Sequence, residues 1–92
     1  MTPEQQNWLD EFMDHFDFTR VARAMKSLQW FWVRNGQKKI PEEYEIRAEA
    51  RRILRMAIDE KSIVSTGGFV AELCSDGLSL KFVLHDYEAF SE

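Results

Sequence analysis

Several features are scarce or absent in this sequence, and each absence excludes a class of protein. A single cysteine, Cys74, rules out an internal disulfide framework and fits a reducing compartment. No apolar run approaches the length of a membrane span, and no basic segment leads into an apolar run near the N-terminus. No internal repeat or low-complexity segment is present. We therefore expect one soluble domain, residues 1–92, that works in the cytosol.

Groups that could catalyse a reaction or bind a metal are also scarce. The two histidines, His15 and His85, are far apart, and neither has a cysteine or histidine at ligand spacing. An activated Cys74 thiolate would need a basic partner, and His85 lies at the far end of the same predicted hairpin. The carboxylates are numerous, but their pattern predicts solvation rather than an apolar pocket. We therefore predict no catalytic residue, no metal site and no cofactor, and we do not expect an enzyme.

The net charge of −4 disfavours general affinity for nucleic acid, but the charges are segregated along the chain. Residues 1–17 carry five acids and no bases, residues 18–55 carry ten bases and four acids, and residues 56–92 carry two bases and seven acids. If the ends fold back on the middle, the charges partly neutralise each other, as is usual on small domains. If they do not, the middle segment presents a basic face.

The best-specified stretch, residues 69–84, predicts a β-hairpin. Its two arms alternate apolar and polar residues, and Asp76 and Gly77 between them are expected to be the two central turn residues. The opposite pairs are then Ser75–Leu78, Leu73–Leu80, Ala71–Phe82 and Phe69–Leu84. The same register pairs Glu72 with Lys81 across the strands. One face gathers the apolar side chains, and a slip of one residue would invert every assignment.

Two helices are predicted at the N-terminal end. Thr2 is the expected N-cap of the first, with Pro3 at the first helical position and Gln5 completing a capping box. Asp17 is the expected N-cap of the second. The polar face of the second helix carries three bases, Arg20, Arg23 and Lys26. A single kinked helix over 3–28 is the alternative.

The longest helix is predicted over 42–60, after Pro41, because apolar residues recur there as one stripe. The stripe consists of Ile46, Ala50, Ile53, Leu54, Ala57 and Ile58. The helix also carries a row of arginines at i, i+4 and i+8, Arg47, Arg51 and Arg55, with Arg52 beside it. Neighbouring acids favour a solvated face, with ion pairs Glu43–Arg47 and Arg55–Asp59. The alternative is an arginine row that binds phosphates.

A second, shorter hairpin is predicted over 29–40, where aromatic and β-branched residues precede Asn35 and Gly36. Lys38 and Lys39 on its return arm would suit an exposed edge. Its first arm carries the aromatic run Trp30, Phe31 and Trp32. On a strand the two tryptophans share one face, and we favour burial of at least one, because aromatics dominate small cores. Exposed tryptophans beside Lys26, Arg34, Lys38 and Lys39 would instead suit base stacking or a partner's pocket.

The stretch Ser65-Thr66-Gly67-Gly68, ahead of the 69–84 hairpin, also has two interpretations. Consecutive glycines beside hydroxyl groups can direct backbone N–H groups at a phosphate. The stretch lacks the lysine and the spacing of a phosphate loop, however, and it precedes a strand rather than a helix. The favoured interpretation is structural: the paired glycines form a bulge or a sharp turn at the start of the strand.

Together these elements predict an α+β fold. An antiparallel sheet of three or four strands, built from the two hairpins, packs against the long helix and the N-terminal helical pair. Residues 85–92 are expected to form a partly frayed acidic tail.

Part of this pattern resembles small acidic proteins of unassigned function encoded by tailed phages and their prophages. The residues that carry the resemblance are Trp30, Trp32, Ile40, Pro41, Glu45, Ile46, Leu54, the run 65–69, Leu78, Leu80 and Phe82. The resemblance covers residues 18–84, and the Ser-Thr-Gly-Gly-Phe run is its most specific part. It implies a bacterial cytoplasm and a role in managing the host or the phage's own replication, and it implies no catalytic residue, cofactor or substrate.

We therefore expect a small non-catalytic accessory protein that binds a host or phage protein. The alternative is a nucleotide or nucleic-acid binding protein that uses the basic 18–55 segment and the Ser65–Gly68 loop. The candidate binding residues are Trp30, Trp32, Arg34, Lys38, Lys39, Arg47, Arg51, Arg55, Ser65, Thr66, Gly67 and Gly68. A homodimer through an edge strand or a Trp-bearing face is a further option, and no membrane partner is expected.

Overall fold

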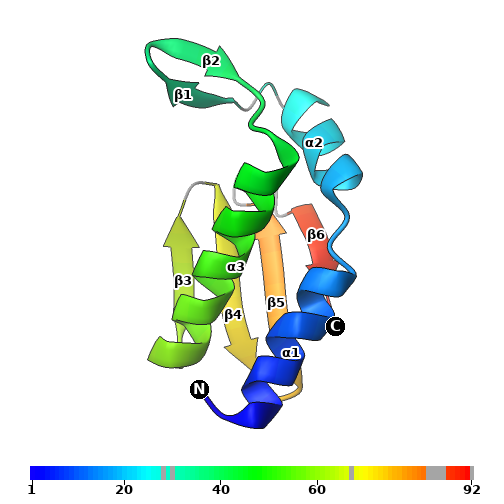
Figure 1. Cartoon of the computed structure of the whole chain (residues 1–92), viewed down its shortest axis with the longest axis vertical. Helices are drawn as coiled ribbons and strands as arrows, with labels where there is room; N and C mark the ends of the chain where they lie inside the picture. The colour runs from blue at the N-terminus through cyan, green and yellow to red at the C-terminus, as the bar shows by residue number, and fades with distance from the viewer. Residues whose placement is uncertain (28, 30, 67, 83–86, 92) are drawn as a thin grey trace.

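A computed structural model of the chain shows a sheet with helices packed on one face (Figure 1). The structure describes residues 1–92 except 28, 30, 67, 83–86 and 92, and at 34, 66, 82 and 87–91 it describes the backbone but not the side chain. The helices are α1 (Pro3–Asp14), α2 (Phe18–Ser27) and α3 (Glu43–Glu60). The strands are β1 (Trp32–Arg34), β2 (Gln37–Lys39), β3 (Ile63–Thr66), β4 (Phe69–Cys74), β5 (Gly77–Phe82) and β6 (Tyr87–Ser91). The predicted α+β class is confirmed.

The main sheet has the strand order β3-β4-β5-β6, and every neighbouring pair is antiparallel. α3 lies across β3, β4 and β5, and α1 lies beside α3 over β5 (Figure 1). α2 contacts α3 and β6. This two-layer arrangement places the core between the sheet and the helices.

The beginnings of α1 and α2 follow the sequence prediction. The Thr2 hydroxyl accepts a hydrogen bond from the Gln5 backbone N–H at 3.1 Å, and the Gln5 side chain accepts one from the Thr2 backbone N–H at 2.8 Å. The Asp17 carboxylate accepts a hydrogen bond from the Arg20 backbone N–H at 3.1 Å, which caps α2. Because the chain leaves the helical conformation at His15, the predicted helix pair is present rather than one kinked helix.

The predicted apolar stripe of α3 forms the centre of the core. All six of its residues are buried: Ile46, Ala50, Ile53, Leu54, Ala57 and Ile58. The sheet contributes Val64, Phe69, Ala71, Leu78 and Leu80. α1, α2 and the turn between them contribute Leu9, Phe12, Phe16, Val21 and Met25. Burying one side chain of this size contributes about 1.5–3 kcal/mol relative to leaving it exposed, so this cluster holds the helices on the sheet.

The hairpin of β4 and β5 is present, but its register differs from the prediction by two residues. Cys74 pairs with Gly77, so Ser75 and Asp76 occupy the turn in place of Asp76 and Gly77. Gly77 has a φ of 144°, a backbone conformation that L side chains rarely adopt, and it begins the return strand. The Asp-Gly pair therefore marks the end of the turn rather than its centre.

The shifted register also replaces the predicted cross-strand charge pair. Glu72 lies opposite Ser79, and Lys81 lies opposite Val70, so the prediction of a Glu72–Lys81 pair is wrong. A shift of two residues keeps each side chain on its predicted face, because side chains alternate with a period of two. The apolar face therefore still meets α3.

Two other parts of the predicted sheet are wrong. β1 and β2 form a separate two-stranded sheet, because the return arm, residues 37–39, is polar and exposed and offers no apolar face to a core sheet. Residues 87–91, expected in a frayed tail, form β6 and pair with β5, which satisfies backbone groups that an edge strand would leave open. The other residues of the predicted tail lie outside the described residues.

Candidate functional site

The basic residues of the middle of the chain gather at one end of the molecule. Between Phe18 and Pro41 the sequence has six basic residues and no acidic one. This segment forms α2 and the β1–β2 hairpin, which lie together at the upper end of the molecule in Figure 1. We name this surface the basic end and define it by the side chains of Arg20, Arg23, Lys26, Lys38 and Lys39. The candidate Arg34 belongs to the same segment, but its side chain lies outside the description.

The hairpin of the basic end is shaped by a two-residue turn. Arg34 pairs with Gln37, so Asn35 and Gly36 form the turn, with φ values of 52° and 76°. Positive φ at both positions is the geometry that Asn-Gly favours in hairpins, because its twist matches that of the strands. The second predicted hairpin is therefore confirmed, and Figure 1 shows it projecting beyond the main sheet.

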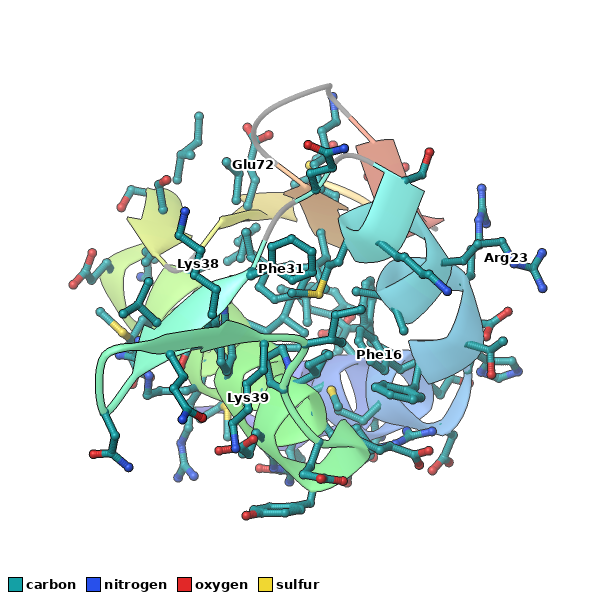
Figure 2. All side chains as sticks on the ribbon, turned by 90° about the horizontal axis from the view of Figure 1, so that it is seen from above. Phe16, Arg23, Phe31, Lys38, Lys39 and Glu72 are labelled. Atoms are coloured by element: carbon teal, nitrogen blue, oxygen red, sulfur yellow. The ribbon has the colours of Figure 1, made fainter. Side chains whose placement is uncertain are left out.

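The hairpin presents charge on both of its faces. Lys38 and Lys39 are exposed and project to opposite sides (Figure 2), as expected of an exposed edge. Val33 lies opposite Lys38 and is 64% exposed. An exposed apolar side chain beside Lys38 gives that face of the hairpin both a charged and an apolar contact.

The two described aromatic residues before the hairpin turn are half-buried rather than exposed. Trp32 is half-buried and packs against the hydrophobic core, in line with the favoured interpretation. Phe31 is also half-buried and lies between the hairpin and α2 in Figure 2. Trp30 lies outside the described residues, so its exposure stays a prediction. Because Trp32 is half-buried, it does not provide one of two fully exposed tryptophans for base stacking.

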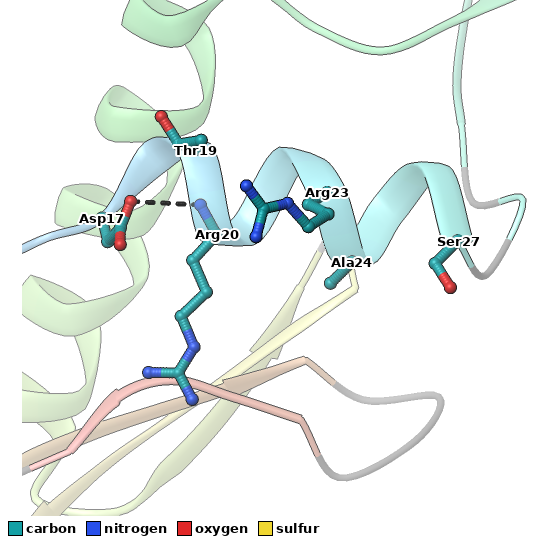
Figure 3. Close-up of a pocket in the computed structure, with 6 residues that line it drawn as sticks. All are labelled: Asp17, Thr19, Arg20, Arg23, Ala24 and Ser27. Atoms are coloured by element: carbon teal, nitrogen blue, oxygen red, sulfur yellow. Dashed lines mark hydrogen bonds between the residues drawn. The ribbon is translucent and has the colours of Figure 1, made fainter.

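α2 carries the other half of the basic end, beside an open pocket (Figure 3). The pocket has a volume of about 490 Å³ and is lined by Asp17, Thr19, Arg20, Arg23, Ala24 and Ser27. Arg20 extends from α2 toward β6 in Figure 3. Arg20 and Arg23 were predicted on the polar face of this helix but not among the binding residues. The acid-free run between residues 18 and 41 could have identified them.

The positive charge of the basic end is largely uncompensated within the described part of the chain. Arg23, Lys26, Lys38 and Lys39 form no ion pair with a described residue, whereas Arg20 does make a further interaction. Exposed charges of this kind create a field that extends about 8–10 Å at physiological salt. The basic end is therefore a surface to which an anionic group is attracted.

Two arginines of the α3 row, by contrast, contact other side chains of the same chain. Arg47 contacts the Glu43 carboxylate at 2.9 Å, and its guanidinium lies 5.5 Å from the centroid of the Phe16 ring. Arg51 reaches Asp10 of α1 at 3.4 Å. The Arg51–Asp10 contact ties α3 to α1, and both ion pairs favour the interpretation of this row as an ion-paired face rather than a phosphate-binding one.

Arg52 lies beside this row on α3, and Arg55 is the third member of the row. Arg52 donates two hydrogen bonds to the Glu49 carboxylate, at 2.6 and 3.2 Å, and these bonds, together with the carboxylate charge, raise the pKa of Arg52 above its ordinary value. Arg55 is exposed, and the predicted pair with Asp59 is not formed in the described structure. The bases of residues 18–55 therefore fall into two groups. Most of those on α3 are paired with neighbouring acids, whereas the basic end keeps most of its positive charge.

The Ser65–Gly68 stretch forms the connection between β3 and β4. Thr66 pairs with Phe69, so the two strands form a hairpin, and of the two predicted features the sharp turn is present, while the described strand pairs contain no bulge. Gly68 has a φ of 92°, which explains why glycine suits a short reversal here. Ser65 is exposed, while Gly67 and the Thr66 side chain lie outside the description. This connection belongs to the main sheet, whereas Lys38 and Lys39 belong to the separate hairpin, so the predicted binding residues are distributed over both sheets and α3.

Reactive side chains do not converge in the described structure. Among the described residues, no group of three His, Cys, Asp or Glu side chains is arranged to hold a metal ion. The His15 Nδ1 lies 2.9 Å from the Glu11 carbonyl oxygen, at the end of α1. Cys74 is a half-buried free thiol on β4, and its candidate partner His85 lies outside the described residues.

The chain matches none of the protein-family models, curated proteins or solved structures with which it was compared. Within the residues that the structure describes, no helix combines the length and the apolar character needed to cross a membrane.

Proposed function

We propose that this chain is a small non-catalytic binding protein whose basic end contacts an acidic surface of a partner protein. The observation that supports this most directly is the separation of charge along the molecule. Residues 18–41 contribute six bases and no acid to one end, while the chain as a whole has a net charge of −4. Val33, exposed beside Lys38, adds an apolar contact to an otherwise charged surface.

A compact protein patch fits this charge distribution better than a nucleic acid does. A nucleic acid longer than the basic end would bring its phosphates toward a body that is acidic on balance, which reduces its electrostatic attraction. An acidic patch on a protein can match one end of the molecule without approaching the rest.

The resemblance of residues 18–84 to proteins of tailed phages and prophages supports a bacterial cytoplasm as the setting. In that setting the partner is a host or phage protein, and the activity is binding rather than catalysis. A role in managing the host or phage replication follows from the same resemblance.

Two charge-matched variants test the proposal. The chain is immobilised and incubated with nuclease-treated bacterial lysate, and the retained proteins are identified by mass spectrometry. We expect one stoichiometric acidic partner that is released as salt is raised. Lys38→Gln/Lys39→Gln should lose it. The control Arg55→Gln/Lys61→Asn removes the same charge elsewhere and should retain it; asparagine suits the φ of 53° at position 61.

Three outcomes would count against the proposal. Failure to retain any stoichiometric protein would remove its basis. Equal loss in both double variants would show that net charge, not the basic end, governs binding. Retention of proteins only from a parallel lysate without nuclease treatment, together with direct binding of a single-stranded oligonucleotide, would support the nucleic-acid alternative instead.

A further inference from the structure

The pocket beside α2 combines groups that bind anions with space for a small molecule. The pocket is open to solvent, and its volume of about 490 Å³ gives room for a small ligand that stays partly exposed. The lining residues are the N-cap Asp17 and five residues of α2 spread over its whole length (Figure 3). The small side chain of Ala24 leaves room between the longer ones.

The hydrogen-bonding groups of the pocket are mostly donors. Arg20 and Arg23 each offer a planar guanidinium, which matches the oxygens of a phosphoryl group, and Thr19 and Ser27 each add a hydroxyl. Asp17 is the one acidic lining residue, and its carboxylate already accepts a hydrogen bond from the Arg20 backbone N–H at 3.1 Å. The balance of charge in the pocket therefore favours an anion.

Of the two arginines, Arg23 is the one available for a ligand. It forms no ion pair or hydrogen bond with a residue that the structure describes, whereas Arg20 has a further interaction in the folded chain. Arg23 is also exposed, so its guanidinium can turn toward a ligand without disturbing the core.

We propose that the pocket beside α2 binds a phosphoryl group, free or as part of a small phosphate ester, with Arg23 as its principal contact. The hydroxyls of Thr19 and Ser27 lie about 12 Å apart along α2, on either side of Arg23, so the phosphoryl group takes a further hydrogen bond from one of them and the remainder of an ester would contact the other. This site goes beyond the proposed partner surface, because it takes a small ligand and its binding is measured with the chain alone.

A titration followed by ¹⁵N–¹H NMR tests the site. Four ligands are compared: adenosine monophosphate, adenosine, inorganic phosphate and pyrophosphate. We expect saturable shifts of the amides of Thr19, Arg23 and Ser27 with the phosphorylated ligands and none with adenosine. Equal affinity for inorganic phosphate and the nucleotide would show that the free ion suffices, and tighter nucleotide binding would identify an ester as the ligand.

Two variants of the same helix separate a specific pocket from general charge. Arg23→Gln removes the principal contact, and we expect it to weaken affinity by about tenfold or more, the usual effect of losing a charge-assisted hydrogen bond. Lys26→Gln removes the same charge from the same helix, but Lys26 does not line the pocket, and we expect a change of at most about twofold.

Three results would overturn the site. Adenosine shifting the same amides as strongly as its phosphate would show that the phosphoryl group is not recognised. Equal weakening by both variants would reduce the effect to net charge. No saturable shift with any phosphorylated ligand would remove the site altogether, and it would leave the partner proposal untouched, since that depends on Lys38 and Lys39.

Discussion

At the residue scale, two aromatic side chains of similar size show how burial decides stability. Phe69 of β4 is fully buried, while Tyr44 in the first turn of α3 is 72% exposed. We expect Phe69→Ala to lower the free energy of unfolding by about 3–5 kcal/mol, because it leaves a cavity in the core. Tyr44→Ala should change it by less than about 0.5 kcal/mol. Urea unfolding followed by circular dichroism measures both, and similar losses in the two variants would contradict the described core.

Residue-level patterns were the most readily predicted part of this molecule. The capping box of Thr2 and Gln5 and the Asp17 cap depend on contacts within one turn, so local sequence specifies them. The α3 stripe was predicted for the same reason, since its period alone defines a face. Local sequence does not predict the contact between Arg51 and Asp10, because that contact depends on how two helices pack.

At the scale of elements, the β1–β2 hairpin should behave as a unit separate from the core. Gly36 has a φ of 76°, and a Cβ added there would meet no atom within 4 Å, so Gly36→Ala strains only the backbone of the turn, by about 1–2 kcal/mol. We expect faster hydrogen exchange of the Lys38 and Lys39 amides. The urea midpoint of the whole chain should hardly change, because the main sheet does not include this hairpin. A large fall in that midpoint would show that the hairpin supports the core.

The main sheet shows why register is harder to predict than a face. Alternation specifies which side chains point to the core, but a shift of two residues satisfies it equally well. The choice between the two registers of β4 and β5 depends on the turn, where Gly77 takes a φ of 144° outside the turn centre. β6 was missed because a strand added at a sheet edge depends on the open backbone of β5, which no local pattern reveals.

At the scale of the whole molecule, the basic end is small, and this limits the contact it can make. The molecule measures 39 × 23 × 20 Å, so a partner confined to one end buries an interface below the usual size of about 1,200–2,000 Å². Such complexes depend on electrostatic steering. We expect the association rate constant with the captured partner to fall at least tenfold between about 50 and 300 mM salt, as electrostatic steering is screened. Stopped-flow fluorescence measures it.

The matched double variants sharpen this prediction. Lys38→Gln/Lys39→Gln should flatten the salt dependence of the association rate, while Arg55→Gln/Lys61→Asn should preserve most of its slope. A dissociation rate that carries the whole salt effect would point to a desolvated ion pair in the complex instead. The sequence alone could not identify this surface. Only the folded chain shows that arginines of α3 are paired with acids while the bases of residues 18–41 lie apart from them.

The hairpin outside the main sheet also has an evolutionary consequence. Core positions of α1, α3 and β4 constrain one another, so inherited changes there must be compensated by neighbours. Val33 and residues 35–39 face solvent, so changes at these positions need no compensating change in the core. The residues of the β1–β2 hairpin, and with them the binding specificity, can therefore change rapidly during evolution while the core stays nearly constant.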